Sequence, residues 1–217
     1  MARSKMAKFA TIAERDNVLQ NGDELYGRLT GRWREVQFGN SYPLVLEIGC
    51  GRGEYTIGMA KLFPNRNFVG VDIKGERLWK GSTRALEEEL YNVAFLRTFV
   101  EQIGEQFAAG EVDEIWVTFP DPRPRDRDIK RRLTSPRFLD IYQQILKPGG
   151  TIHLKTDNLP LYEYTLEVLQ ERTPKDLLHT ADLYHSDLQQ YTMGIYTTYE
   201  KRYMAEGIPI KYLQFKV

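Results

Sequence analysis

The chain has 217 residues, which suits one sizeable domain, and 41% of them are hydrophobic, enough to form a buried core. Lysine and arginine together number 30, as do aspartate and glutamate, so the formal net charge is zero. A protein that binds nucleic acid through its overall charge is therefore excluded, and contact with a polyanion must come from local basic clusters.

The first fifteen residues are basic but lack the apolar centre of a secretory signal peptide. No apolar run is long enough to cross a membrane, and the one cysteine, Cys50, cannot form an internal disulfide. We therefore expect a cytoplasmic protein without a metal site, as a monomer or a homodimer. Residues 1–40 are predicted to form a basic arm and a helical lead-in, and residues 41–217 a single domain.

Strand-like and helix-like segments alternate from residue 43 onward. The helical stretches are predicted to cover 54–62 and 76–90 and to begin again at Ser135 and Asn158. Alternating strands and helices form a mostly parallel sheet with helices on both faces, so an α/β fold is expected. The predicted strands are 43–48, 67–71, 93–96, 114–119 and 151–154.

Acidic residues lie at or just after the C-terminal ends of four predicted strands. They are Glu47, Asp72, Asp121 and Asp157. The C-terminal strand ends of a parallel sheet meet at one rim, where ligands bind. The sequence therefore predicts a ligand site that these carboxylates share.

A glycine-rich loop, EIGCGRG, follows the first predicted strand and precedes a helix. Gly49, Gly51 and Gly53 allow a tight turn and a close approach of the backbone to a ligand. Asp72 can accept hydrogen bonds from both hydroxyls of a ribose. Glu47, two residues before the first glycine, suits a cationic ligand better than a pyrophosphate, which disfavours a nicotinamide oxidoreductase. A turn that merely connects two elements is the structural alternative.

A basic loop, residues 116–132, has the sequence WVTFPDPRPRDRDIKRR. Its prolines restrict the backbone around Asp121 and indicate a positioned turn. A carboxylate beside so many cations suggests chemistry next to phosphates, with a solvated surface loop as the alternative. The six basic residues are Arg123, Arg125, Arg127, Lys130, Arg131 and Arg132.

Four motifs resemble those of known proteins. The E-x-G-x-G-x-G pattern resembles motif I of the S-adenosylmethionine-dependent methyltransferases. FPDPRPRDRDIKRRL resembles the FxDPWPKxRHxKRRL signature of the bacterial tRNA (guanine-N7-)-methyltransferases, and LKTDN and TTYE resemble that family's (F/L)KTDN and TxYE. The resemblance covers nearly all of the chain after the first forty residues. It implies a Rossmann-like class I methyltransferase fold, S-adenosylmethionine as cofactor, and methylation of guanine N7 in tRNA, in the variable-loop region.

The resemblance also implies roles for single residues. Guanine N7 has a lone pair and no proton, so Asp121 is expected to orient the guanine and stabilise developing positive charge rather than act as a base. Cofactor contacts are expected from Glu47, Gly49, Gly51, Gly53, Asp72, Phe99 and Asp121. Substrate contacts are expected from Arg125, Asp157, Thr197, Thr198, Tyr199 and Glu200. Contacts with RNA phosphates are expected from Arg127, Lys130, Arg131 and Arg132.

The sequence departs from the family pattern at four positions. Arg123 replaces a tryptophan, Arg125 a lysine, Asp128 a histidine and Phe99 an aspartate. Other interpretations stay open for three residues: a helix N-cap for Asp157, a core position for Phe99 and a solvated helix face for Glu200. The alternative functions are another RNA or small-molecule S-adenosylmethionine-dependent methyltransferase, and a non-catalytic RNA-binding protein with a vestigial cofactor pocket.

Overall fold

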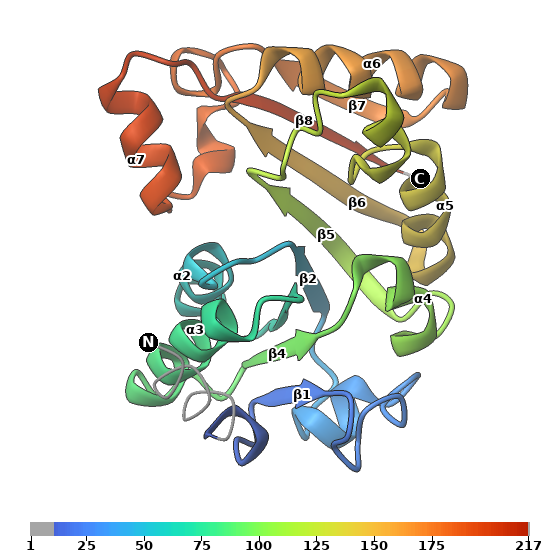
Figure 1. Cartoon of the computed structure of the whole chain (residues 1–217), viewed down its shortest axis with the longest axis vertical. Coiled ribbons are helices and arrows are strands. Elements are labelled where there is room, and N and C mark those ends of the chain that lie inside the picture. The colour runs from blue at the N-terminus through green and yellow to red at the C-terminus, as the bar shows by residue number, and fades with distance from the viewer. Residues whose placement is uncertain (1–10, 217) are drawn as a thin grey trace.

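An eight-stranded sheet runs through the molecule in the order β1-β4-β3-β2-β5-β6-β8-β7 (Figure 1). The structure, a computed structural model, describes residues 11–216, so the basic residues Arg3, Lys5 and Lys8 lie outside the described part. The strands are β1 (Val18–Gln20), β2 (Leu44–Ile48), β3 (Asn67–Asp72), β4 (Val93–Arg97), β5 (Val112–Thr118), β6 (Leu146–Thr156), β7 (Lys175–Thr180) and β8 (Lys211–Lys216). The α-helices are α2 (Glu54–Leu62), α3 (Gly75–Glu87), α4 (Ile103–Gln106), α5 (Pro136–Ile145), α6 (Leu159–Arg172) and α7 (Thr198–Ala205). Shorter helices are η1 (Trp33–Gln37), η2 (Val100–Gln102), η3 (Asp126–Arg131), η4 (Leu183–His185) and η5 (Gln189–Thr192).

The strand directions confirm the predicted mostly parallel sheet. Along the sheet, each pair of neighbouring strands from β1 through β4, β3, β2 and β5 to β6 is parallel. Strand β8 lies between β6 and β7 and is antiparallel to both. From β2 the chain builds the sheet outward through β3 and β4 on one side, and then through β5 and β6 on the other. The strand order therefore reverses at β2, and the crevice beyond its C-terminal end is where such sheets bind ligands.

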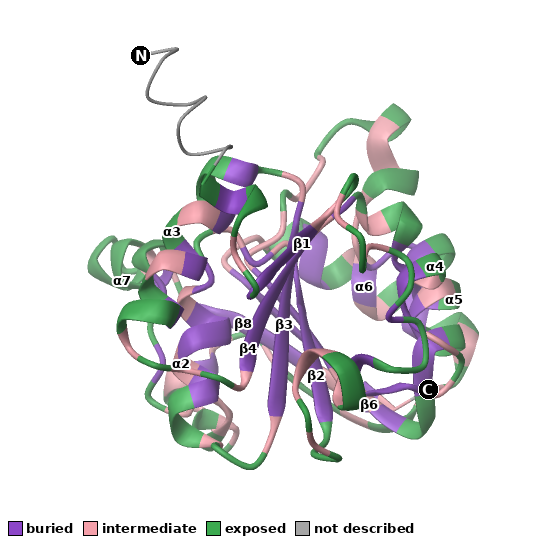
Figure 2. Cartoon of the chain, turned by 90° about the horizontal axis from the view of Figure 1, so that it is seen from below, coloured by how far each residue is buried: buried purple, intermediate pink, exposed green. Residues whose placement is uncertain are grey.

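Alternate residues of the central strands face two separate cores. In β2, Leu44, Leu46 and Ile48 pack with α5 and α6, whereas Val45 packs with α2 and α3. This alternation follows from the two-residue period of a strand. The central strands are buried along most of their length (Figure 2). Helices thus cover both faces, and no helix in the part that the structure describes is long and apolar enough to cross a bilayer.

The structure adds elements that the sequence analysis did not predict. Strands β7 and β8 and helix α7 come after the last predicted helix. Strand β6 begins at Leu146, so Gly149 and Gly150 lie inside it, whereas we had predicted that strand to start at residue 151. The pairing of β5 with β6 shifts register between Val112 and Glu114, which accommodates the glycine pair as an irregularity between two interior strands.

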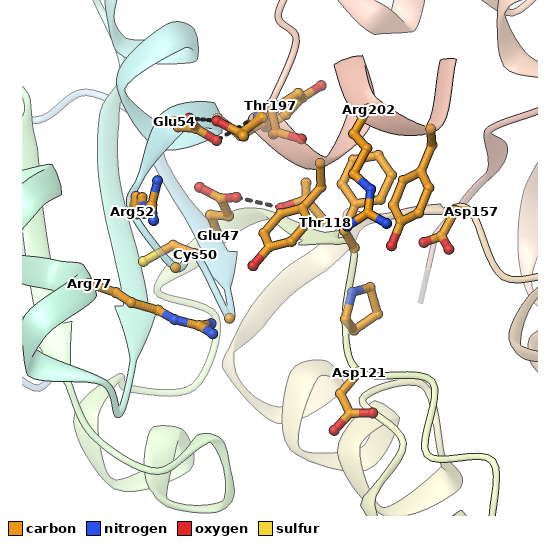
Figure 3. A pocket seen from close by; sticks show the side chains of 18 of the residues that line it. Glu47, Cys50, Arg52, Glu54, Arg77, Thr118, Asp121, Asp157, Thr197 and Arg202 are labelled. Carbon is orange, nitrogen blue, oxygen red and sulfur yellow. Dashed lines mark hydrogen bonds between the residues drawn. The ribbon is translucent and has the colours of Figure 1, made fainter. Parts of the chain in front are cut away.

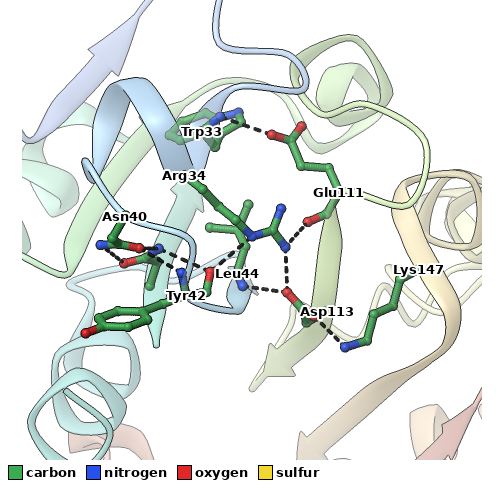
Figure 4. Close-up of polar contacts among 9 residues, drawn as sticks. Trp33, Arg34, Asn40, Tyr42, Leu44, Glu111, Asp113 and Lys147 are labelled. Carbon is green, nitrogen blue, oxygen red and sulfur yellow. Dashed lines mark hydrogen bonds and ion pairs between the residues drawn. The ribbon is translucent and has the colours of Figure 1, made fainter. Parts of the chain in front are cut away.

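The described part of the N-terminal segment packs into the same core. Trp33 is 1% exposed, and Arg34 donates to the Glu111 carbonyl and to Asp113 Oδ2, each at 2.7 Å (Figure 4). Asp113 also accepts from the Leu44 amide and pairs with Lys147. This network lies at the N-terminal ends of β2 and β5, at the opposite end of the strands from the predicted ligand site. Whether residues 1–40 form a unit of their own stays a prediction.

Candidate active site

A cavity of about 760 Å³ lies beyond the C-terminal ends of β2, β5 and β6 (Figure 3). The glycine loop and α2 form one wall, and the loop after β5 and the first turns of α7 form the other. The predicted residues that line the cavity are Glu47, Gly49, Gly51, Asp121, Asp157, Thr197, Thr198 and Tyr199. Segments far apart in the sequence therefore meet at one rim.

Glu47 lies at the bottom of the cavity and is 2% exposed. Its carboxylate accepts hydrogen bonds from the amide and hydroxyl of Thr56 and from the hydroxyl of Thr118. Burial raises its pKa to about 7, against the lowering effect of these three hydrogen bonds. Glu47 thus joins α2 to the end of β5, and its protonation state changes near neutral pH.

The glycine loop has an open side and a packed side. Gly51 has φ +57°, and a Cβ built on it would meet nothing within 4 Å, so any side chain would project into the cavity. Gly53, the N-cap of α2, faces the other way, where a Cβ would lie 2.6 Å from Phe95. Asp72 accepts from the amides of Gly51 and Lys74 at 3.0 and 2.7 Å and fixes the loop against β3. Gly53 therefore serves the packing of the loop rather than its open face.

The loop after β5 holds Asp121 at the mouth of the cavity. Phe119 and Arg123, on either side of it, have φ values of +48° and +47°, a left-handed conformation that is uncommon for residues other than glycine. The Asp121 carboxylate accepts from the Arg123 amide at 3.2 Å and pairs with the Arg123 guanidinium at 3.2 Å. The residue that departs from the family's tryptophan therefore contacts the candidate catalytic acid directly.

The KTDN and TTYE segments meet through a buried ion pair. Lys155 Nζ lies 2.6 Å from Glu200 Oε1, and neither side chain is exposed to solvent. Burial lowers the pKa of Lys155, whereas Glu200 and Glu47 act to raise it. Tyr184 also donates to Glu200 at 2.6 Å, and this contact together with burial raises the pKa of Tyr184. Glu200 is thus neither a solvated residue nor a lining residue of the cavity.

The first turn of α7 is fixed from two sides. Thr197 and Glu200 form a reciprocal capping box, in which the Thr197 hydroxyl accepts from the Glu200 amide at 3.1 Å. Thr198 donates both its amide and its hydroxyl to Glu54, at the start of α2. Tyr199, 53% exposed, is held at the entrance of the cavity.

Asp157 does not cap α6, because that position belongs to Asn158, whose side chain accepts from the Leu161 amide at 2.9 Å. Asp157 instead lines the cavity beside Tyr203. The pKa of Tyr203 is raised by burial and by this carboxylate. Asp157 thus faces the cavity with the Tyr203 hydroxyl as a partner of its carboxylate.

Several predicted residues lie outside the cavity wall. Phe99 is 56% exposed at the end of β4, so it is not a core residue. Arg125, Arg127 and Lys130 are exposed on the loop after β5, and Arg131 pairs with Asp128 at 3.3 Å. Arg132 differs, because its guanidinium stacks 4.4 Å from the Tyr164 ring centroid. The cluster therefore combines exposed cations with one that anchors the loop to α6.

The cavity also contains basic and aromatic residues that we had not predicted. Arg202 and Tyr203 come from the turn of α7 that follows TTYE, Arg77 and Lys80 from α3, and Arg52 from the glycine loop (Figure 3). The spacing of Arg77 and Lys80 on one helix face after Asp72 was a signal that could have placed them. The cavity thus presents carboxylates to a cationic ligand and basic side chains to anionic groups that bind beside that ligand.

Comparison with known proteins connects this geometry to function. A family model described as "Putative methyltransferase" matches residues 41–213. The chain is 48% identical to the tRNA (guanine-N(7)-)-methyltransferase of Cytophaga hutchinsonii, over 100% of this chain and 98% of that protein. The protein of the same name from Listeria innocua is 40% identical, over 86% of this chain and 85% of its own.

Solved structures share the fold at low sequence identity. The 16S rRNA methyltransferase KamB gives a TM-score of 0.63 at 18% identity, over 83% of this chain and 90% of that one. A 16S rRNA (adenine(1408)-N(1))-methyltransferase from Catenulisporales acidiphilia, solved with its cosubstrate, gives 0.58 at 16% identity, over 81% and 85%. These likenesses establish the Rossmann-like class I methyltransferase fold.

Proposed function

The chain belongs to the tRNA (guanine-N(7)-)-methyltransferase family, and from this membership we propose which residues of the pocket serve the reaction. The enzyme transfers a methyl group from S-adenosylmethionine to N7 of a guanine in tRNA. The sulfonium of the cofactor supplies an electrophilic methyl group. Because N7 attacks with a lone pair and has no proton to lose, the protein has to position the two reactants rather than supply a strong base. The observation that carries the residue assignment is that the glycine loop, Asp121 and the TTYE turn line one cavity.

The residues on the glycine side of the cavity fit the cofactor. Gly51 leaves open the space that a side chain would fill, and Asp72 lies at the end of β3, where an acid can accept from ribose hydroxyls. Phe99 presents an exposed ring, beyond the end of β4, on which an adenine can stack. Glu47, whose oxygens already accept from two threonines, joins α2 to β5 and in its ionised form provides negative charge for the cationic end of the cofactor.

The opposite side of the cavity suits the guanine. We assign Asp121 and Asp157, which line this side, as acceptors for the N–H groups of the base, and the positive charge of the methylated ring favours a carboxylate nearby. Thr197, Thr198 and Tyr199 shape the entrance. We assign Glu200 to this site as a positioning residue, since its buried carboxylate fixes the turn that carries the other three.

The exposed cations of the basic loop suit the RNA backbone. Arg125, Arg127, Lys130 and Arg131 follow Asp121 in the same loop, and we assign them to phosphates next to the target nucleotide. The guanine has to leave its stacked position to reach the cavity. The stacking of Arg132 on Tyr164 favours an anchoring role for that residue over a phosphate contact.

Finer points follow from the resemblance to the family. We place the target guanine in the variable-loop region and the enzyme in the cytoplasm, as a monomer or a homodimer. Digestion of modified tRNA followed by mass spectrometry of the fragments locates the nucleoside. A methylated fragment from another region would overturn the placement, and light scattering separates the two assembly states.

Replacement of Asp121 tests the site assignment. With unmodified tRNA and labelled cofactor, Asp121→Asn should lower kcat by about tenfold or more, because the protein loses one fixed negative charge that stabilises the transition state. Asp126→Asn is the matched control, an exposed acid of the same loop that does not line the cavity. Equal rates for Asp121→Asn and the wild type would remove Asp121 from catalysis.

A further inference from the structure

The carboxylate of Asp121 is engaged on both oxygens by a single residue. Oδ1 accepts from the backbone amide of Arg123 and Oδ2 contacts Arg123 Nε, each at 3.2 Å. The group that we assign to guanine recognition is therefore occupied before any substrate arrives. The tryptophan that the family carries at this position has an indole N–H donor but no positive charge, so the ion pair depends on the arginine of this chain.

The ion pair is exposed and therefore easily exchanged. The side chain of Asp121 is 62% exposed and that of Arg123 is 41% exposed. Solvent-exposed pairs contribute little to stability, because water and salt screen them. A phosphate presents two oxygens to the planar guanidinium and forms a stronger, bidentate contact. A phosphate of bound RNA thus competes well with the carboxylate for Arg123.

The backbone at Arg123 is held independently of this ion pair. Arg132 Nε donates to the Arg123 carbonyl at 3.3 Å, and its guanidinium is fixed on the ring of Tyr164. The side chain of Arg123 can therefore change partner while the loop that carries Asp121 keeps its place. The bond from the Arg123 amide continues to orient the carboxylate after the guanidinium leaves.

We propose that Arg123 is a phosphate-binding residue that masks Asp121 until tRNA binds. In the free enzyme its guanidinium pairs with the carboxylate, and in the complex a backbone phosphate next to the target guanine takes the guanidinium. The exchange releases Oδ2 of Asp121 toward the base. Release of the carboxylate affects the reaction only if Asp121 contacts the guanine, so this proposal rests on the guanine-binding role that we assign to Asp121.

The exchange is tested with short oligouridylate, which carries phosphates but no guanine. Its affinity is measured by fluorescence anisotropy for the wild type, Asp121→Asn, Arg123→Ala and the double variant. Loss of the carboxylate frees Arg123, so Asp121→Asn should bind about 1.4- to 5-fold more tightly than the wild type, the range of an exposed ion pair. In the Arg123→Ala background the same change should give a clearly smaller gain. Arg32→Ala is the matched control for Arg123→Ala, since Arg32 also forms an exposed ion pair, with Glu35, at 3.2 Å.

Three results would overturn the proposal. An equal gain in both backgrounds would mean that Asp121 only repels RNA, and no gain would mean that the pair is not exchanged. With tRNA, Arg123→Ala should raise KM and reduce the slope of log KM against log salt by about 0.7–0.9, with kcat nearly unchanged. A loss confined to kcat would instead make Arg123 a static support of Asp121. Oligouridylate lacks guanine, so its binding tests the exchange of Arg123 alone, whereas the methyl-transfer rate of Asp121→Asn tests the catalytic role of Asp121. The two proposals can therefore fail independently.

Discussion

Replacement of Lys155 with methionine tests the buried ion pair between the KTDN and TTYE segments. Lys155 and Glu200 are fully buried 2.6 Å apart, so the substitution leaves a carboxylate without its cation. Removal of one partner from a buried pair costs about 3–5 kcal/mol. Glu200 keeps hydrogen bonds from the Tyr184 hydroxyl and the Thr197 amide. We therefore expect a loss near the lower limit, about 3 kcal/mol of the free energy of unfolding.

Urea unfolding followed by circular dichroism measures this loss in the free energy of unfolding, and we expect the m value of the variant to equal that of the wild type. Lys216→Met is the matched control, because Lys216 also lies 2.6 Å from its partner, Asp176, but both side chains are exposed. That variant should lose less than about 1 kcal/mol. The double variant Lys155→Met/Glu200→Gln removes both charges and should be more stable than Lys155→Met alone, since no buried charge is left unpaired.

Two results would refute the reasoning. A loss for Lys155→Met as small as that of the control would mean that the cation does not stabilise the buried carboxylate. A double variant no more stable than Lys155→Met would mean that lost packing, rather than unpaired charge, causes the effect. Active variants should show a raised KM for tRNA, because Thr197 and Thr198 at the entrance depend on the same turn.

Two further predictions concern the cofactor side of the cavity. Because burial raises the pKa of Glu47 from its ordinary 4.5 to about 7, the folded state holds an extra proton between these values, and stability should fall by up to about 3 kcal/mol as the pH rises through that window. Thermal unfolding against pH should show this slope in the wild type and a flatter profile in Glu47→Gln, and identical profiles would contradict it. Gly51→Ala places a methyl group in the open side of the loop, so calorimetry should show cofactor affinity reduced by about tenfold, with about 1–2 kcal/mol of destabilisation from the left-handed backbone. Unchanged affinity would mean that the cofactor lies away from Gly51.

The features that the sequence predicted well are those that depend on local patterns. The rim position of Glu47, Asp121 and Asp157 follows from strand ends, and parallel strands bring such ends together wherever they lie in the chain. Asp72 also ends a strand, but it binds the backbone of the glycine loop and does not line the cavity. The start of α5 is likewise local, since Ser135 precedes the proline of its first turn.

The features that the sequence did not predict depend on partners distant in the chain. Nothing near Glu200 in α7 indicates burial, since Lys201 and Arg202 follow it, and its environment is set by Lys155 on strand β6. Arg132 belongs to a run of cations and differs from them only because Tyr164 of α6 lies beneath it. Such contacts require the tertiary fold, which the local pattern does not contain.

The position of β8 in the sheet sets an order of assembly. Because β8 lies between β6 and β7, an emerging chain that has completed β7 must wait for residues 211–216 before β7 finds its neighbour. Helix α7, which contributes to one wall of the cavity, lies between β7 and β8 in the chain. The six strands that pair in parallel are complete by residue 156 and can form during synthesis, whereas the cavity wall on α7 emerges later and the sheet is completed only with β8.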